Sequence, residues 1–153
     1  MECGIYGCPA QWAKLLPQGA RRLRTGGQLR ARKWDVLALT PETRRDFLNG
    51  WRERFRIRRK PCGAELSCGL LLVPGNCPEE WLSRIRADSA VSYGLSVRDS
   101  LTFSSLEEPT LCVQRALPRP DGIIIEPREI PLPGLPAPVE QYLPLLGLWL
   151  LCG

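Results

Sequence analysis

Residues 90–133, AVSYGLSVRDSLTFSSLEEPTLCVQRALPRPDGIIIEPREIPLP, alternate short apolar and polar runs with turn-forming residues, and they decide the fold. In Ser100–Ser104, Leu101 and Phe103 share one face, and the hydroxyl residues take the other. Thr110–Gln114 repeats this pattern. Because successive side chains leave a strand on opposite faces, the alternation predicts two half-buried strands.

Turn-forming residues separate these strands. Glu107–Pro109 predicts one turn, and Pro118–Gly122 predicts another, since Asp-Gly tolerates the positive φ that hairpins need. The β-branched run Ile123–Ile125 follows. Prolines in Glu126–Pro133 cannot donate to a ladder, so we expect an edge strand, or irregular chain, beyond Ile125. The whole stretch predicts two or three antiparallel strands.

Upstream, residues 1–95 alternate candidate strands with candidate helices. Apolar runs predict strands over residues 2–8, 34–39, 69–73 and 90–94. Helical spacing predicts a helix that begins near Pro9, and capping signals predict helices that begin near Thr40 and Asn76. Their expected apolar faces are Trp12, Leu15 and Leu16; Phe47, Leu48, Trp51 and Phe55; and Trp81, Leu82 and Ile85. The basic segment 20–33 is expected to turn at Gly26-Gly27.

This rhythm predicts an α/β fold: a three-layer, Rossmann-like, mostly parallel sheet with an antiparallel β-hairpin extension and a C-terminal helix. We expect a single α/β domain over 1–153, with parallel βα units over 1–95, antiparallel strands over 96–136 and the helix over 137–153. The apolar run 139–152 is shorter than the roughly 20 residues that span a bilayer. We therefore expect it to dock on the domain and not to enter a membrane.

Composition excludes several chemistries. The chain of 153 residues has no histidine, which removes Ser-His-Asp and Cys-His catalysis and His-containing zinc sites. Its seven cysteines form no CxxC pair, and no basic-then-apolar leader follows Met1, so we expect reduced thiols and a cytoplasmic location. A zinc site of Cys62, Cys68 and Cys77 with Cys3 or Cys8 fits no standard spacing. We expect neither a metal nor a cofactor.

Charge is unevenly distributed. Residues 1–60 carry fifteen Lys and Arg against five Asp and Glu, a net of +10, whereas residues 61–153 carry a net of −5. The basic half makes nucleic acid a candidate partner, with Trp12, Trp34 and Trp51 as stacking platforms. The candidate anion or nucleic-acid contacts are Arg21, Arg22, Arg24, Arg30, Arg32, Arg58, Arg59 and Lys60.

From Gly69 to Gly153 the layout resembles the later half of the central, ATP-binding domain of the Mur ligases, which join amino acids to peptidoglycan precursors. Val91–Leu95 is similar to that family's "yGl" strand, and Ile130–Gly134 to its "lpLpG" turn. The resemblance implies a Rossmann-like ATP-binding fold. The family's glycine-rich phosphate loop, however, is replaced by Gly7–Trp12, which has no lysine-threonine pair and contains a proline. No catalytic residue carries over.

Three functions follow as hypotheses. The first is a binding or regulatory module of Mur-ligase-like topology without ATP-dependent ligase activity. The second is the nucleic-acid binder. The third is an enzyme with Cys8 as nucleophile, activated between a strand and a helix, with Asp35, Glu42, Asp99, Glu126 and Glu129 as available carboxylates. The apolar segment Leu145–Leu151 is in addition a candidate surface for a protein partner.

Overall fold

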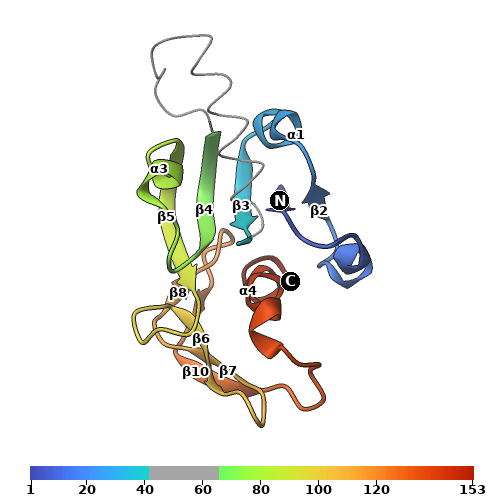
Figure 1. Ribbon diagram of the computed structural model, residues 1–153. Coiled ribbons are helices and arrows are strands. Elements are labelled where there is room, and N and C mark those ends of the chain that lie inside the picture. The colour runs from blue at the N-terminus through green and yellow to red at the C-terminus, as the bar shows by residue number, and fades with distance from the viewer. Residues whose placement is uncertain (42–65) are drawn as a thin grey trace.

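An eight-stranded sheet organises the part of the chain that the computed structural model describes, residues 1–41 and 66–153 (Figure 1). The strand order is β10-β7-β6-β5-β4-β3-β1-β2. Pairing is parallel from β2 to β6 and antiparallel from β6 through β7 to β10. The parallel strands are β1 (Cys3–Tyr6), β2 (Ala20–Leu23), β3 (Trp34–Leu39), β4 (Leu66–Pro74) and β5 (Ile85–Tyr93). The predicted mostly parallel sheet is confirmed.

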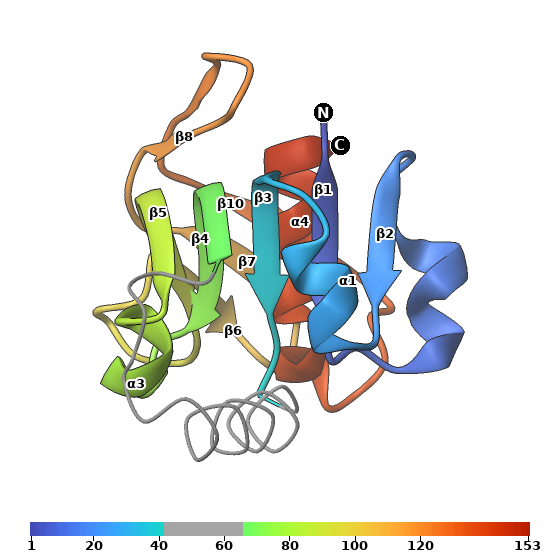
Figure 2. The same cartoon turned by 90° about the horizontal axis from the view of Figure 1, so that it is seen from above.

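Helices cover both faces of this sheet and make three layers. Figure 2 shows α1 (Gly26–Arg30) and α4 (Leu143–Cys152) on opposite sides of β1 and β3. Two hydrophobic clusters correspond to the two interfaces: Leu29 of α1 packs with one set of strand residues, and Leu148 of α4 packs with the other. Alternate residues along β3 and β4 therefore enter different clusters, as the pleat requires.

The chain winds outward from the centre of the sheet in both directions. It passes from β1 to β2 on one side, and then continues from β3 through β4 to β5 on the other. This is a doubly wound order, whose reversal lies between β1 and β3. In such sheets, ligands bind beyond the carboxyl ends of the strands.

The antiparallel extension continues the sheet past β5. β6 (Leu101–Ser105) pairs with β5 only through Tyr93 and Leu101, because the chain loops out and resumes in the same direction. β7 (Thr110–Val113) then returns beside β6, and β10 (Arg128–Pro131) takes the sheet edge. Figure 1 shows these three strands grouped at one end of the parallel strands, with α4 beside them. The predicted alternation and the proline-bearing edge strand are confirmed.

A separate hairpin joins β8 (Leu117–Pro118) to β9 (Ile124–Ile125). Its turn is the predicted Pro118–Gly122 segment. Gly122 adopts φ +88°, a left-handed conformation that an L side chain disfavours. The break after Ile125 is also as predicted, since the chain leaves the hairpin before it enters β10.

Three local predictions were wrong. The helix after Pro9 is a 3₁₀ helix, η1 (Ala10–Leu15), so α-helical spacing does not apply, and Leu15 is 47% exposed. Gly26-Gly27 opens α1 instead of a turn, because Thr25 and Gln28 form a capping box. Ile85 begins β5, and α3 (Glu79–Leu82) is a single helical turn with Leu82 exposed.

The predicted docking of the C-terminal helix is confirmed. A 3₁₀ turn, η2 (Val139–Tyr142), leads into α4, which buries Leu145, Leu148 and Leu151 against the sheet. Most of the segment proposed as a partner surface is thus interior, although Trp149 is 48% exposed. None of the helices within the described residues has the length and apolar character needed to cross a bilayer. The helix predicted from Thr40 onward lies outside the described residues after Pro41.

Close approach of α4 to the sheet depends on Gly147. A Cβ at this position would lie 2.6 Å from Cδ2 of Leu72 and 3.0 Å from Cδ1 of Leu101, both of which are fully buried. We predict that Gly147→Ala lowers the free energy of unfolding by about 1–3 kcal/mol, the usual cost of overpacking a core. Urea denaturation monitored by tryptophan fluorescence measures it.

Gly27→Ala is the matched control, since a Cβ there meets nothing closer than Oγ1 of Thr25 at 3.8 Å. We expect it to leave stability unchanged or to raise it by up to about 1 kcal/mol, because alanine is the better helix former. Equal effects of the two substitutions would contradict the close helix–sheet contact.

Candidate functional site

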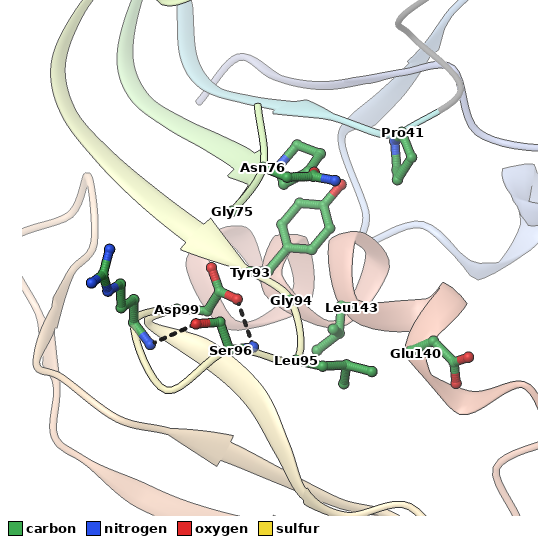
Figure 3. A pocket seen from close by; sticks show the side chains of 12 residues that line it. Pro41, Gly75, Asn76, Tyr93, Gly94, Leu95, Ser96, Asp99, Glu140 and Leu143 are labelled. Carbon is green, nitrogen blue, oxygen red and sulfur yellow. Dashed lines mark hydrogen bonds between the residues drawn. The ribbon is translucent and has the colours of Figure 1, made fainter. Parts of the chain in front are cut away.

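A pocket of about 590 Å³ lies at the carboxyl ends of β3, β4 and β5, to one side of the reversal between β1 and β3 (Figure 3). Segments that follow these strands form most of it, and η2 and the start of α4 close the other side. The lining residues are Pro41, Pro74, Gly75, Asn76, Tyr93, Gly94, Leu95, Ser96, Arg98, Asp99, Glu140 and Leu143.

Asp99 is the buried acid of this pocket, with only 4% of its surface exposed. Its Oδ2 accepts a hydrogen bond from the Ser96 backbone N–H at 3.1 Å, and its own N–H donates to the Ser96 carbonyl at 3.0 Å. Figure 3 shows the first of these bonds, below Tyr93. The side chain thus closes the loop that connects β5 to β6.

Two glycines make room for this carboxylate. A Cβ on Gly75 would overlap Oδ1 of Asp99, and a Cβ on Gly94 would lie 2.5 Å from Oδ2. Gly75 follows β4 and Gly94 follows β5, so the carboxylate is held against the ends of two neighbouring strands. Any larger residue at either position would displace it.

One oxygen of the carboxylate is left over for a ligand. Oδ1 of Asp99 accepts no hydrogen bond from the described part of the chain. Removing a carboxylate oxygen from water is unfavourable unless a donor replaces the lost hydration. An incoming N–H or O–H group would supply that donor.

Tyr93 forms a rigid wall of the pocket. Its hydroxyl donates to the Leu39 carbonyl at 2.6 Å, which ties the end of β5 to the end of β3. The Gly75 N–H donates to the Tyr93 carbonyl at 2.8 Å. Burial raises the pKa of the Tyr93 hydroxyl well above its ordinary value, so it stays protonated and keeps its hydrogen bond. In Figure 3 the Asn76 side chain lies beside this ring.

Cys8 lies in a setting that disfavours a nucleophile. It is 4% exposed, and burial raises the pKa of its thiol, although neighbouring Arg22 opposes that shift. Nε of Arg22 donates to the Cys8 carbonyl at 3.1 Å. The following η1 has no side-chain cap, and Cys8 does not line the pocket. The hypothesis of a Cys8 nucleophile remains a prediction, without geometric support.

The basic residues that the structure describes in the first half, up to Lys33, do not line the pocket. Glu2 pairs with Arg32 at 3.0 Å and with Arg21 at 3.8 Å on the protein surface. Arg24 and Arg30 are exposed. The remaining candidates, Arg58, Arg59 and Lys60, lie outside the described residues.

The structure corrects the prediction that Trp12 and Trp34 are stacking platforms for nucleic-acid bases. Trp12 is 6% exposed and stacks on Tyr142 with ring centroids 5.6 Å apart. Trp34 is 1% exposed, and its Nε1 donates to the Leu29 carbonyl at 2.9 Å. Both rings pack in the core, so neither is available to stack on a base. Trp51 lies outside the described residues.

Of the five carboxylates named from the sequence, the structure places only Asp99 in the pocket among those it describes. Asp35 accepts the Glu2 N–H at 2.6 Å, Glu126 and Glu129 are exposed, and Glu42 is outside the described residues. Gly75, Asn76, Gly94 and Ser96 were missed as site residues. A glycine directly after an apolar strand was the available signal.

The described cysteines, all of them free thiols, do not assemble a metal site. No group of three Cys, Asp or Glu side chains in residues 1–41 and 66–153 could hold an ion. Burial raises the pKa of Cys68 to about 12 and that of Cys77 to about 11, so both are protonated near neutral pH. Cys62 lies outside the described residues.

Comparison of the chain with protein-family models, curated proteins and solved structures finds no match.

We predict that Gly75 and Asp99 are energetically coupled. Gly75→Ala alone should destabilise the protein by about 1–3 kcal/mol, because the new methyl group displaces the carboxylate. In an Asp99→Ala background the same change should cost at least about 1 kcal/mol less, since the obstacle is gone. A double-mutant cycle from urea denaturation measures the coupling.

Asp88→Ala provides the matched background, because Asp88 is an exposed acid on β5 that does not line the pocket. Its combination with Gly75→Ala should be additive within about 0.5 kcal/mol. Additivity with Asp99→Ala as well would show that the carboxylate does not rest on Gly75.

Proposed function

We propose that this chain is a binding module that holds a small polar molecule in the pocket above Asp99. The observation that carries the proposal is Asp99 itself: the residue is 4% exposed at the carboxyl ends of the parallel strands, and the described residues leave its Oδ1 unpaired. A buried acceptor in a concave site favours a ligand that donates to it.

The pocket suits a small molecule in size and lining. Its volume of about 590 Å³ falls in the range of roughly 300–1,000 Å³ typical of ligand sites. Pro41, Tyr93 and Leu143 provide apolar walls, whereas Asn76 and Asp99 provide polar groups. The ligand class that fits is a molecule with an ammonium, amide or hydroxyl group for Oδ1 and an apolar body for the walls.

The proposal does not include ATP-dependent ligation. Mur-ligase-like topology remains part of it, supported by the antiparallel extension beyond a parallel sheet. The segment after β1 gives no support to a phosphate loop: Pro9 has no N–H, and a 3₁₀ helix without a side-chain cap follows it. The sequence there also lacks the lysine-threonine pair that serves phosphate and magnesium.

A fragment screen by amide chemical shifts tests the proposal. The probes are organic amines, neutral amides and polyols, and phosphate monoesters. We expect amines or neutral donors to shift the amide signals of Gly75, Gly94 and Ser96 with saturable affinity. Asp99→Asn should weaken an amine hit at least about tenfold, because it removes a charge-assisted hydrogen bond.

Glu140→Gln is the matched control, since Glu140 is an exposed acid that also lines the pocket. It should change the affinity for the same amine by less than about threefold, as expected for a solvent-screened charge. Calorimetric titration with Mg-ATP forms a separate arm. Tight magnesium-dependent ATP binding, or a screen in which no probe moves these three amides, would overturn the proposal.

A further inference from the structure

The inference concerns two cysteines far from the pocket that belong to different elements. Cys3 is the first residue of β1, and Cys152 is the last residue of α4. Both belong to the hydrophobic cluster that joins α4 to the sheet, Cys3 as a buried member and Cys152 packed against it. In Figures 1 and 2 alike, the start of β1 and the end of α4 lie together.

The orientation of each residue follows from its element. Cys3 and Ile5 alternate along β1 and both enter the α4-facing cluster, whereas Tyr6 enters the opposite cluster. On α4, Cys152 follows Leu148 by four residues and Leu145 by seven, so the three share the sheet-facing side. The pKa of each thiol is influenced most strongly by the other thiol, so the two side chains are neighbours.

Arg119 holds this end of the helix in place. Its Nη1 donates to the Leu150 carbonyl at 3.0 Å, and its Nη2 donates to the Gly153 carbonyl at 3.2 Å. Asp121 fixes the guanidinium through an ion pair of 3.1 Å. The carbonyls at the end of α4 are therefore satisfied by a side chain from the β8–β9 hairpin, and Cys152 is kept beside β1.

We infer that Cys3 and Cys152 are a redox-active pair that forms a reversible disulfide with hydrogen peroxide as the oxidant, linking β1 to α4. The inference is independent of the pocket ligand. It concerns a covalent modification of the α4–sheet interface.

The chemistry balances in two steps. One of the two thiols, as thiolate, attacks one peroxide oxygen, the O–O bond breaks, and the departing hydroxide takes a proton to leave as water, which gives a sulfenic acid. Sγ of the other cysteine then attacks that sulfur and loses its proton, the S–O bond breaks, and a second water leaves. Two thiols are oxidised, and one peroxide is reduced to two waters.

Each thiol is the largest influence on the pKa of the other, lowering it for Cys3 and raising it for Cys152. Either sulfur can therefore be oxidised first, and its neighbour then completes the disulfide. Cys152 is the more exposed of the two.

Peptide mapping of the full chain after mild peroxide treatment tests the inference. The expected product is a peptide pair joined by a disulfide between Cys3 and Cys152, formed first and reversed by dithiothreitol. The oxidised protein should also melt several degrees higher than the reduced protein, because the new link closes a long loop of the unfolded chain.

Separate Cys3→Ser and Cys152→Ser variants should each lose the cross-link and the thermal shift. Cys112→Ser is the matched control, because Cys112 is a partly exposed thiol on β7, and it should retain both. Oxidation of the wild-type protein with Cys3 and Cys152 still unlinked, or a first-formed disulfide between any other pair, would overturn the inference. The peptide map of the oxidised wild-type protein needs no variant, so it tests the inference even if a serine variant fails to fold.

Discussion

The carboxylate of Asp99 fits between two glycines, and the architecture around the pocket depends on that fit. Gly75 ends the β4 region and Gly94 ends the β5 region, and a side chain on either would collide with the acid. By accepting the Ser96 N–H, the same carboxylate closes the loop from which β6 departs. One buried side chain thus joins the ends of the parallel strands to the start of the antiparallel extension. The Ser96 N–H replaces part of its lost hydration, and Oδ1 is left for a ligand.

The pocket results from a change of direction in the sheet. Parallel pairing stops after Tyr93 and Leu101, and the antiparallel strands continue beyond the carboxyl ends of β3 and β4. On the same side, α4 approaches the sheet closely at Gly147, and its first residue, Leu143, reaches the pocket wall. Here the antiparallel extension and α4 enclose the carboxyl ends of the parallel strands, and this enclosed space is the pocket. A link between Cys3 and Cys152 would fasten the far end of that helix.

Much of the fold was predictable because its signals are local. The apolar runs of β3 and β4, the Asp-Gly turn ending at Gly122 and the prolines around β10 each have one natural interpretation. The errors arose where a local device overrode propensity, as when the Thr25–Gln28 capping box made a helix of Gly26-Gly27. The candidate site was harder to predict from the sequence. Asp99 was one of five carboxylates, and only the folded chain brings it against Gly75, which is 24 positions away in the sequence.

Hydrogen exchange at the Ser96 amide tests the central role of Asp99 most directly. The bond from Ser96 N to Oδ2 should protect that amide in the native protein. Asp99→Ala should speed its exchange by about tenfold or more, the loss expected for one hydrogen bond to a charged acceptor. Amides in the centre of β4, such as that of Leu71, should keep their protection. Unchanged exchange at Ser96 would contradict the account.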